Sequence, residues 1–586
     1  MNQSTLEYLR SIKPSDHKNG MEILREGIEM GKSIELGKTK FREANDGMSF
    51  LQFKKKLREE GRTLWNVLAG LATLQEEVEL IAEFYRWSRE NNIKCDIVQS
   101  IASGVVALPK EYRDKAPSTT SYVMDGVEDY KAQMDASPMM VSFGDYILSS
   151  PNAIETTKNS ILSGCELIGE FSQIIWDYTG YSDNLQRCSD VVRAVGMCAA
   201  KYDQDVMVQT YLDDGIPGYC LDCTSYVAYA MLEHHIVSKL CGARYIVSFG
   251  GLISEAATRA GIAMAIDKAL STEDQPALHY MNSSTNLQWD HDIHGNYGMS
   301  VKEFLFEILM NKKFNLGICI NPVSITEKIA VPTMRELMDI FAAGSRTEED
   351  CEEWLPFMDF SELETMRDVM TEKAQLMFAN TLEALEAAGF DINDPLEMSM
   401  FIHDVNPMMY EEMFHPSTYN EGKPSVQAYY PTVLARQTME IRDGMIEEAR
   451  AEGLEGCLNG KKIVTVSGDA HTYGLKVVEG MLQFAGASIV NGGVDMSAAD
   501  VLDLADEEDS VNICISCHNG QCLGYAKLLK QLAAERGRSY NVFMGGKLNA
   551  ILPGASEPCD VSDMLTEMGI DAGNDMISTI RKLRDL

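Results

Sequence analysis

Basic residues are scarce in this chain of 586 residues: 51 Lys and Arg stand against 88 Asp and Glu, which gives a formal net charge of −37. Nucleic acids and anionic membrane surfaces are both bound through clusters of basic side chains. The deficit of such side chains therefore argues against either partner, and we expect neither a nucleic-acid partner nor a membrane partner.

Long apolar runs and targeting patterns are also missing. No stretch reaches the roughly 18 apolar residues of a membrane-spanning helix, and the N-terminal stretch lacks the basic-then-apolar order of a signal peptide. The 14 cysteines are scattered through the chain, with no array of Cys and His at the spacing of a zinc site. We therefore expect a cytoplasmic protein with reduced thiols.

The length of the chain is enough for two to four domains, and its patterns divide it into four. We expect a helical segment over 1–90, a catalytic barrel over 91–332, a helical extension and linker over 333–456, and a last domain over 457–586. Within the first segment, Phe50–Leu68 and Glu76–Arg89 read as helices.

Strands and helices alternate from about residue 93 onward, which predicts a parallel sheet. The predicted helices between strands are Ala153–Ser163, Asn184–Ala200, Thr224–Leu240, Ser254–Ala269 and Val301–Lys312. The predicted strands are Cys95–Ile101, Met139–Phe143, Glu166–Phe171, Val206–Leu212, Arg244–Phe249, Leu278–Ser283 and Leu316–Ile320. Seven such units favour a closed (β/α)8 barrel of the TIM type, whose eighth strand would precede residue 90 or lie near Ile329–Val331.

Catalytic residues of such a barrel lie at the carboxyl ends of its strands. The polar residues at those ends are Gln99, Ser100, Asp145, Glu170, Gln209, Tyr211, Asp213, Asp214, His279, Tyr280, Asn282 and Asn321. Among them we name Glu170, Gln209, Tyr211 and Asp213 as candidate catalytic residues, although each could instead cap a helix. The ends are acidic, whereas Arg113, Arg187, Arg193 and Arg259 fall on loops or helices. Acidic ends suit an amine or a polyhydroxy substrate better than a carboxylate.

The segment Lys461–Gly474, KKIVTVSGDAHTYG, carries the most specific pattern in the chain. A strand over Ile463–Ser467 leads into a loop with Asp469 and His471, and a helix follows over Leu475–Phe484. An Asp two residues before a His can accept a hydrogen bond from one ring nitrogen and so orient the other toward a metal. A helix-capping Asp and a solvated His would explain the loop alone equally well.

Two downstream motifs strengthen the first interpretation. Ser516 follows Gly474 with 41 residues between them, and Gly545-Gly546 follow His518 with 26 between. The three motifs resemble the D-x-H-x-x-G, S-x-L and G-G signature of base-off cobalamin-binding domains, with His518 in place of the usual Leu.

This resemblance implies a C-terminal flavodoxin-like cobalamin domain and assigns roles to its residues. His471 would be the lower cobalt ligand, with Asp469 as its hydrogen-bond partner and Gly474 closing the loop motif. Ser516 would contact the displaced nucleotide base, and Gly545 and Gly546 would leave room for the nucleotide tail.

The segment from Val206 to Leu270 looks like part of the barrel of glutamate mutase and its relatives, through VMVQTYLDD and SYVAYAMLEHHIVSKLCGARYIVSFGG. With the C-terminal motifs, the chain resembles the adenosylcobalamin-dependent carbon-skeleton mutases, and as a single chain it resembles 2-methyleneglutarate mutase more than two-component glutamate mutase. The resemblance implies an isomerase that uses adenosylcobalamin to rearrange a small acid. We also expect a homo-oligomer.

Three other functions remain open at this stage. A cobalamin-dependent ammonia-lyase or aminomutase would suit the acidic strand ends. A corrinoid methyltransferase would use the same cobalt ligand but usually has a helical cap before the sheet. A cobalamin sensor would leave so large a barrel unexplained.

Overall fold

The structure is a computed structural model of the 586-residue chain. It describes residues 3–115, 121–178, 180–216, 220–251, 253, 255–272, 289, 291–327, 333–405, 407–423, 425–468, 473–493, 496–518, 522–550, 552 and 559–586. The chain forms two compact units, here called unit 1 (Met1–Thr432) and unit 2 (Val433–Leu586). Each unit is described by itself.

Unit 1 is built on a curled, fully parallel sheet of seven strands in the order β6-β5-β4-β3-β2-β1-β7. Neighbours along the chain are neighbours in the sheet, and β7 returns to pair with β1, as strands do in a barrel. The strands are β1 Leu64–Ala69, β2 Ile97–Ser100, β3 Met140–Phe143, β4 Leu167–Ile168, β5 Met207–Tyr211, β6 Arg244–Ser248 and β7 Cys319–Ile320.

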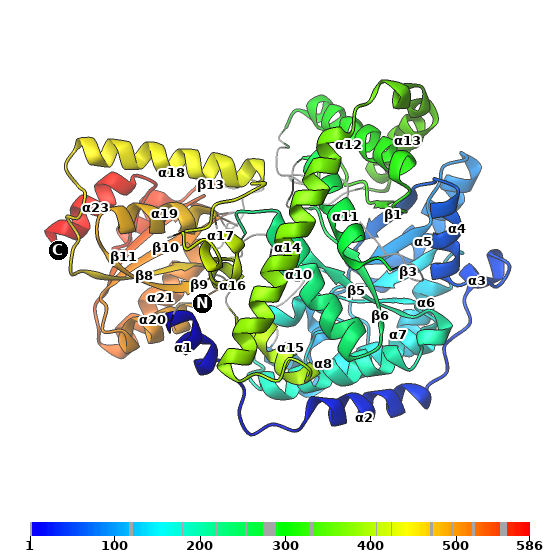
Figure 1. Ribbon diagram of the computed structural model, residues 1–586, viewed down its shortest axis with the longest axis horizontal. Helices are drawn as coiled ribbons and strands as arrows, with labels where there is room; N and C mark the ends of the chain where they lie inside the picture. The colour runs from blue at the N-terminus through cyan, green and yellow to red at the C-terminus, as the bar shows by residue number, and fades with distance from the viewer. Residues whose placement is uncertain are drawn as a thin grey trace. The chain divides into compact units, whose positions relative to one another are not determined.

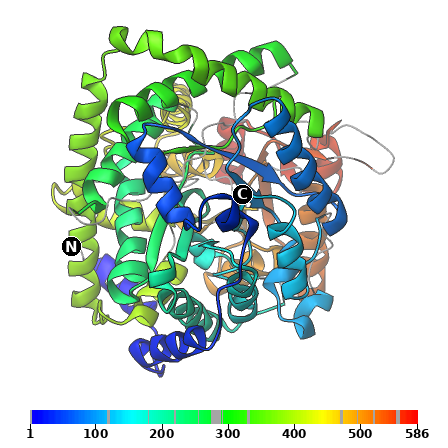
Figure 2. The same ribbon diagram turned by 90° about the vertical axis from the view of Figure 1, so that its right-hand side faces the viewer.

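Helices surround this sheet (Figures 1 and 2), and most contact the next helix along the chain. The longest, α14, packs along α10 and α11 (Figure 1). The described α-helices of unit 1 are α1 Gln3–Ser11, α2 Gly20–Lys32, α3 Lys40–Ala44, α4 Phe50–Glu59, α5 Leu74–Glu90, α6 Val127–Met134, α7 Ala153–Ser163, α8 Asn184–Ala199, α9 Leu212–Gly215, α10 Thr224–His234, α11 Ala256–Leu270, α12 Ile293–Phe314, α13 Met334–Asp350, α14 Ser361–Ala388, α15 Pro395–Asp404, α16 Pro407–Phe414 and α17 Pro416–Tyr419.

The predicted alternation of strands and helices is confirmed, with one correction. The helix predicted over Phe50–Leu68 ends at Glu59, because Gly61 takes a positive φ of 64° and turns the chain, and Leu64–Ala69 form β1. A strand therefore does precede residue 90. The predicted strand Leu278–Ser283 and the alternative position Ile329–Val331 lie outside the described residues.

The two faces of the sheet in unit 1 differ in what they contact. Trp65 points to the helices, where its ring lies 5.8 Å from that of Phe304 in α12 and 6.1 Å from that of Phe341 in α13. Side chains alternate along a strand, so Asn66 and Leu68 belong to the opposite face. We call this opposite face the inner face.

Unit 2 is a second parallel sheet, of five strands in the order β14-β11-β10-β8-β9. Numbered along the chain, this is the order 2-1-3-4-5 of flavodoxin-like folds. Its strands are β8 Lys462–Ser467, β9 Ser488–Gly493, β10 Asn512–Cys517, β11 Asn541–Gly546 and β14 Asp571–Ala572, beside a small antiparallel pair, β12 Asn549–Ala550 and β13 Cys559–Asp560. Its helices are α18 Val433–Ala451, α19 Tyr473–Phe484, α20 Ala498–Glu507, α21 Cys522–Arg536, α22 Ser562–Glu567 and α23 Met576–Asp585.

The boundary between the two compact units falls before α18, at residue 433. Helix α18 packs against α19 and α23, so it adds a wall to unit 2. Among the described residues, no helix combines the length and apolar character needed to cross a membrane.

Candidate functional site

The chain order of strands reverses between β8 and β10, the two central strands of unit 2. Ligands of open α/β sheets bind at the carboxyl ends of the strands beside such a reversal. Strand β8 leads into the loop with Asp469 and His471, and β10 ends in Ser516 and Cys517. Asp469 and His471 themselves lie outside the described residues, so their proposed roles stay predictions.

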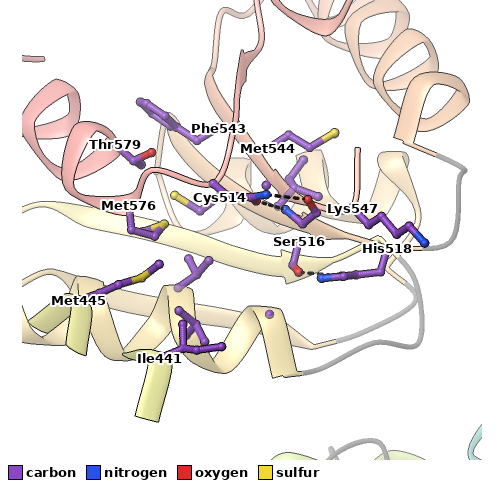
Figure 3. Close-up of a pocket in the computed structure, with 18 residues that line it drawn as sticks. Ile441, Met445, Cys514, Ser516, His518, Phe543, Met544, Lys547, Met576 and Thr579 are labelled. Carbon is purple, nitrogen blue, oxygen red and sulfur yellow. Dashed lines mark hydrogen bonds between the residues drawn. The ribbon is translucent and has the colours of Figure 1, made fainter. Parts of the chain in front are cut away.

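A cavity of about 470 Å³ opens beside these strand ends (Figure 3). Four of the residues predicted from the motifs, Gly474, Ser516, Gly545 and Gly546, line this one cavity. Its remaining lining is mostly apolar and comes from α18, α19, β10, β11, α23 and the loops beside them: Ile441, Met445, Val477, Val478, Cys514, Ile515, His518, Phe543, Met544, Lys547, Gly573, Asn574, Met576 and Thr579. A mostly apolar cavity with a few polar groups is a typical site for an organic ligand.

The three glycines make room that any side chain would fill. A Cβ at Gly474 would lie 2.5 Å from His518 Cε1 and 2.6 Å from Ser516 Oγ. A Cβ at Gly546 would lie 2.3 Å from the Cys517 carbonyl oxygen, and its φ of +107° is reserved for glycine. At Gly545 a Cβ would approach the Gly573 carbonyl oxygen to 3.0 Å. This part of the cavity therefore requires glycine at all three positions. Such an arrangement suits a ligand that lies directly against the backbone.

Asn574 holds the Gly546 corner in place, and the sequence analysis missed it. Gly546 N donates to Asn574 Oδ1 at 2.6 Å, and Asn574 Nδ2 donates to the Gly546 carbonyl at 2.9 Å. An isolated Asn near the last helix has no sequence signal, because this pairing spans 28 residues. The walls supplied by α18 and α23 were likewise not predicted.

His518 stands where the resemblance predicts Leu, and it keeps its ring beside the motif serine. Ser516 Oγ and His518 Nδ1 are 3.4 Å apart (Figure 3). The Ser516 carbonyl accepts from Gly468 N at 2.9 Å, which ties the end of β10 to the end of β8. Within the described part of the chain, no group of three His, Cys, Asp or Glu side chains is arranged to hold a metal ion.

In unit 1, the candidate catalytic residues Glu170 and Gln209 meet on the inner face of the sheet. Gln209 Nε2 donates to Glu170 Oε1 at 2.9 Å, and Ser142 Oγ donates to Gln209 Oε1 at 2.5 Å. A Cβ at Gly144 would lie 2.9 Å from Glu170 Oε1, so a glycine is needed beside this carboxyl group. Burial, with Asp145 and Asp214 nearby, raises the pKa of Glu170 well above its usual range.

Asp145 and Asp214 are joined by an amide that the sequence analysis did not select. Gln173 Nε2 donates to Asp145 Oδ1 at 2.8 Å and to Asp214 Oδ2 at 3.0 Å. Burial raises the pKa of Asp145 to about 6. Burial and the neighbouring Asp145 raise the pKa of Asp214 well above its usual range. With Glu170 these two form what we call the carboxyl cluster.

Tyr211 and Asp213, the other two candidate catalytic residues, form a separate pair. Tyr211 OH donates to Asp213 Oδ2 at 3.2 Å, and Gly250 N donates to Asp213 at 3.2 Å. Helix α9 begins directly after Tyr211, so Asp213 lies in its first turn. This position agrees with either predicted role of Asp213, as a catalytic residue or as a helix cap.

A further buried acid, Glu233, lies on the outer face of the sheet. It accepts from Ser172 Oγ at 2.7 Å, from Thr210 Oγ1 at 2.5 Å and from Tyr245 OH at 3.0 Å. These bonds tie α10 to β5 and β6. Burial raises the pKa of Glu233 to about 7.

The four arginines expected away from the strand ends lie on helices, with acidic or backbone partners. Arg259 in α11 is fully buried between Glu303 and Glu307 of α12. Arg187 in α8 donates to the Ser149 carbonyl at 3.2 Å. Arg193 in α8 pairs with Glu26 and Asp190, and Arg113 in a 3-10 turn pairs with Asp125.

Part of unit 2 is similar to a known protein family. Residues 462–562 match the model of the B12 binding domain. Glutamate mutase sigma subunit 2 from Haloarcula marismortui is 31% identical over 83 residues, which are 14% of this chain and 56% of that protein. The fused isobutyryl-CoA mutase from Geobacillus kaustophilus is 29% identical over 94 residues, 16% of this chain and 9% of that protein.

The matched stretch thus spans about half of the first relative and less than a tenth of the second. It contains the three motifs and most of the cavity described above, while Ile441, Met445, Asn574 and α23 lie beyond it. The C-terminal unit of this protein contains a B12-binding domain.

Proposed function

We propose that the chain is a B12-dependent mutase, an isomerase that rearranges the carbon skeleton of a small molecule with adenosylcobalamin as its cofactor. The observation that carries the proposal is the glycine-lined cavity of unit 2. It lies within a B12-binding domain whose relatives are named mutases. The curled parallel sheet of unit 1 supports it, because a barrel-like site can shield reactive chemistry from water. The proposal also includes a homo-oligomeric state, with a small molecule as the substrate.

The residues of unit 2 fit the cofactor that the family binds. Gly545 and Gly546 would admit its nucleotide tail into the apolar cavity, and Ser516 would donate to the displaced base. As the motif implies, His471 would bind the cobalt, and Asp469 would orient the imidazole ring of His471. When bound, adenosylcobalamin supplies radical chemistry through its weak cobalt–carbon bond.

The residues of unit 1 would bind and position the substrate. Glu170 can form a hydrogen bond through its inner-face carboxyl group, whose pKa burial raises well above the usual range. Gln209 fixes the orientation of that group through Oε1. Tyr211 and Asp213 offer a hydroxyl and a carboxylate at the end of β5.

The carboxyl cluster favours a second candidate function, a cobalamin-dependent ammonia-lyase or aminomutase. Burial raises the pKa of all three acids, and neighbouring acids raise those of Glu170 and Asp214 further, so a cationic amine would be favoured beside them. A methyltransferase is less well supported, because the single helix α18 precedes the sheet of unit 2 where a larger helical cap is usual.

The functions are separated by what happens to the mass of the substrate. We would incubate the full chain anaerobically with adenosylcobalamin and small acids and amines, then analyse the products by NMR and mass spectrometry. A mutase yields an isomer of unchanged mass, and a lyase releases ammonia. Turnover that occurs only with methylcobalamin and a methyl acceptor would refute both.

The cobalt ligand can be tested without turnover. Reduced cobalamin bound to protein labelled with nitrogen-15 histidine should show an altered nitrogen splitting in its electron paramagnetic resonance spectrum. The splitting should disappear in His471→Ala and persist in His518→Leu, the matched control within the same cavity. An unaltered splitting on labelling would exclude a histidine ligand. Asp469→Ala should weaken cobalamin binding about 10- to 100-fold.

A further inference from the structure

Asn66 is the most unusual polar side chain in unit 1. It is fully buried in the middle of β1, and neither Oδ1 nor Nδ2 has a hydrogen-bond partner among the described residues. Leaving a buried amide unpaired costs about 1–3 kcal/mol, and such groups are rare in folded proteins. A leucine has a similar branched outline without polar atoms and would avoid this cost, so the amide needs a partner that the described residues do not supply.

The position of Asn66 shows where that partner would lie. Trp65 faces the helices, so Asn66 faces inward. The register pairs Leu68 with Gln99 and Gln99 with Ser142, and Ser142 donates to Gln209, so these side chains share the inner face with Asn66.

Further polar groups extend this inner face on both sides. Continuing the register of β1 with β7 by one residue sets Asn66 beside buried Asn321. Glu170, also fully buried, hydrogen-bonds through Oε1, whereas its Oε2 has no partner among the described residues. The inner face therefore carries amides and carboxyl groups with hydrogen-bonding capacity to spare, among apolar side chains such as Ile97, which pairs with Asn66.

The described strands of this face offer no cation at their carboxyl ends to receive a carboxylate. Of the seven described strands of unit 1, only β6 contains a basic residue, Arg244 at its first position. Arg244 lies at the amino end of the sheet, where it pairs with Asp205 and donates to the Tyr202 carbonyl. A desolvated carboxylate without a cation or several donors is strongly disfavoured.

We propose that Asn66 is a substrate-contacting specificity residue, and that the buried end of the substrate carries an amine rather than a carboxylate. The amine would donate to Asn66 Oδ1 and to the carboxyl group of Glu170. This proposal rests on the proposed function only in taking the inner face as the substrate site, and it can be tested by binding alone.

The first test is stability, with Asn66→Leu in the full chain. If the amide is kept for a ligand, the leucine should raise the Tm of the protein without ligand, because it removes an unpaired polar group. Thr157→Val is the matched control, since Thr157 Oγ1 is buried and unpaired among the described residues but lies on α7. It should be neutral or stabilising as well. A lower Tm for Asn66→Leu would show a structural partner for the amide and overturn the proposal.

The second test is binding, measured by calorimetric titration without cofactor. The probes are 1,4-diaminobutane and 2-aminoethanol against glutamate and 2-methyleneglutarate. We expect an amine to bind, with at least about tenfold lower affinity in Asn66→Leu and in Asn66→Ala, and unchanged affinity in Thr157→Val.

Each result distinguishes this inference from the function proposed above. Binding of a dicarboxylate that survives Asn66→Leu, or no binding of either amine, overturns the inference and leaves the mutase proposal standing. Amine binding that depends on Asn66, in a protein that isomerises none of the compounds tested, would support the inference and contradict the mutase proposal.

Discussion

The two parallel sheets of this protein differ in what their side chains do near the carboxyl ends of the strands. In unit 2 a cavity exists because side chains are missing: Gly474 and Gly546 leave backbone open to the cavity. In unit 1 the inner face is occupied by polar side chains that orient one another, such as Gln209 with Glu170. The first arrangement is sensitive to any added atom, whereas the second is sensitive to charge. The predictions below use this difference, in order of decreasing effect.

Gly546→Ala should have the largest effect. Its Cβ would meet the Cys517 carbonyl at 2.3 Å in a backbone conformation with φ +107°, so we expect unit 2 to lose at least about 2 kcal/mol of stability and most of its cobalamin affinity. Cobalamin absorbance titration measures the affinity. Gly524→Ala in α21 is the control, because a Cβ there meets nothing within 4 Å. Equal affinities in the two variants would contradict a backbone cradle.

Asp145→Asn should show that unit 1 responds to charge. Burial raises the pKa of Asp145 from 3.8 to about 6, so the folded protein holds a proton that the unfolded chain releases. Stability from this group is therefore lost as pH rises from about 4 to about 6. The asparagine should add about 3 kcal/mol at pH 8 and about half of that at pH 5.

Urea unfolding followed by tryptophan fluorescence measures this effect, because all 5 tryptophans precede residue 433 and so report on unit 1. Exposed Asp203→Asn is the control and should change stability by less than about 0.5 kcal/mol at either pH. A gain in Asp145→Asn that is the same at both pH values would mean that its charge is not the cause.

Asn574→Ala should have a moderate effect on unit 2. It removes both hydrogen bonds that hold Gly546, at 2.6 and 2.9 Å, which we expect to cost about 1–2 kcal/mol and to weaken cobalamin binding about tenfold. Asn574→Asp keeps the acceptor for Gly546 N and should lose less affinity than the alanine. The reverse order of affinities would show that the donor, not the acceptor, positions the corner.

Ile441→Ser should have the smallest effect. Ile441 in α18 is 56% exposed yet lines the cavity, so its removal should change stability by less than about 0.5 kcal/mol. If α18 is a wall of the cofactor site, cobalamin binding should still weaken a few-fold. The control is the neighbouring variant Glu440→Ser, because Glu440 does not line the cavity. An equal loss of cobalamin affinity in both variants would show that α18 is not part of the cofactor site.

Local patterns in the sequence were enough to predict most of both folds. The helix predicted over Ala153–Ser163 has those bounds in the structure, since Gly164 with φ +91° ends it. Six predicted strands appear in unit 1, because alternation of apolar strands and amphipathic helices is a property of neighbouring residues. The prediction failed at β1, where a helical pattern was continued past Gly61.

The motif residues of unit 2 could also be selected from spacing, and Gly474, Ser516 and Gly546 do line one cavity. Their spacing carries information because each follows its own strand, and parallel strands bring their ends together. The structure does not describe Asp469 and His471, whose roles still rest on the sequence.

The sequence by itself therefore determined the order of strands and helices and the three motifs of unit 2. Only the tertiary structure decided that Asn574 holds Gly546, that Gln173 joins Asp145 to Asp214, and that Asn66 is buried without a partner. The physical reason is the range of the interactions. Periodicity and glycine turns act between neighbours, whereas a hydrogen bond or its absence depends on which distant side chains the folded sheet brings to one face.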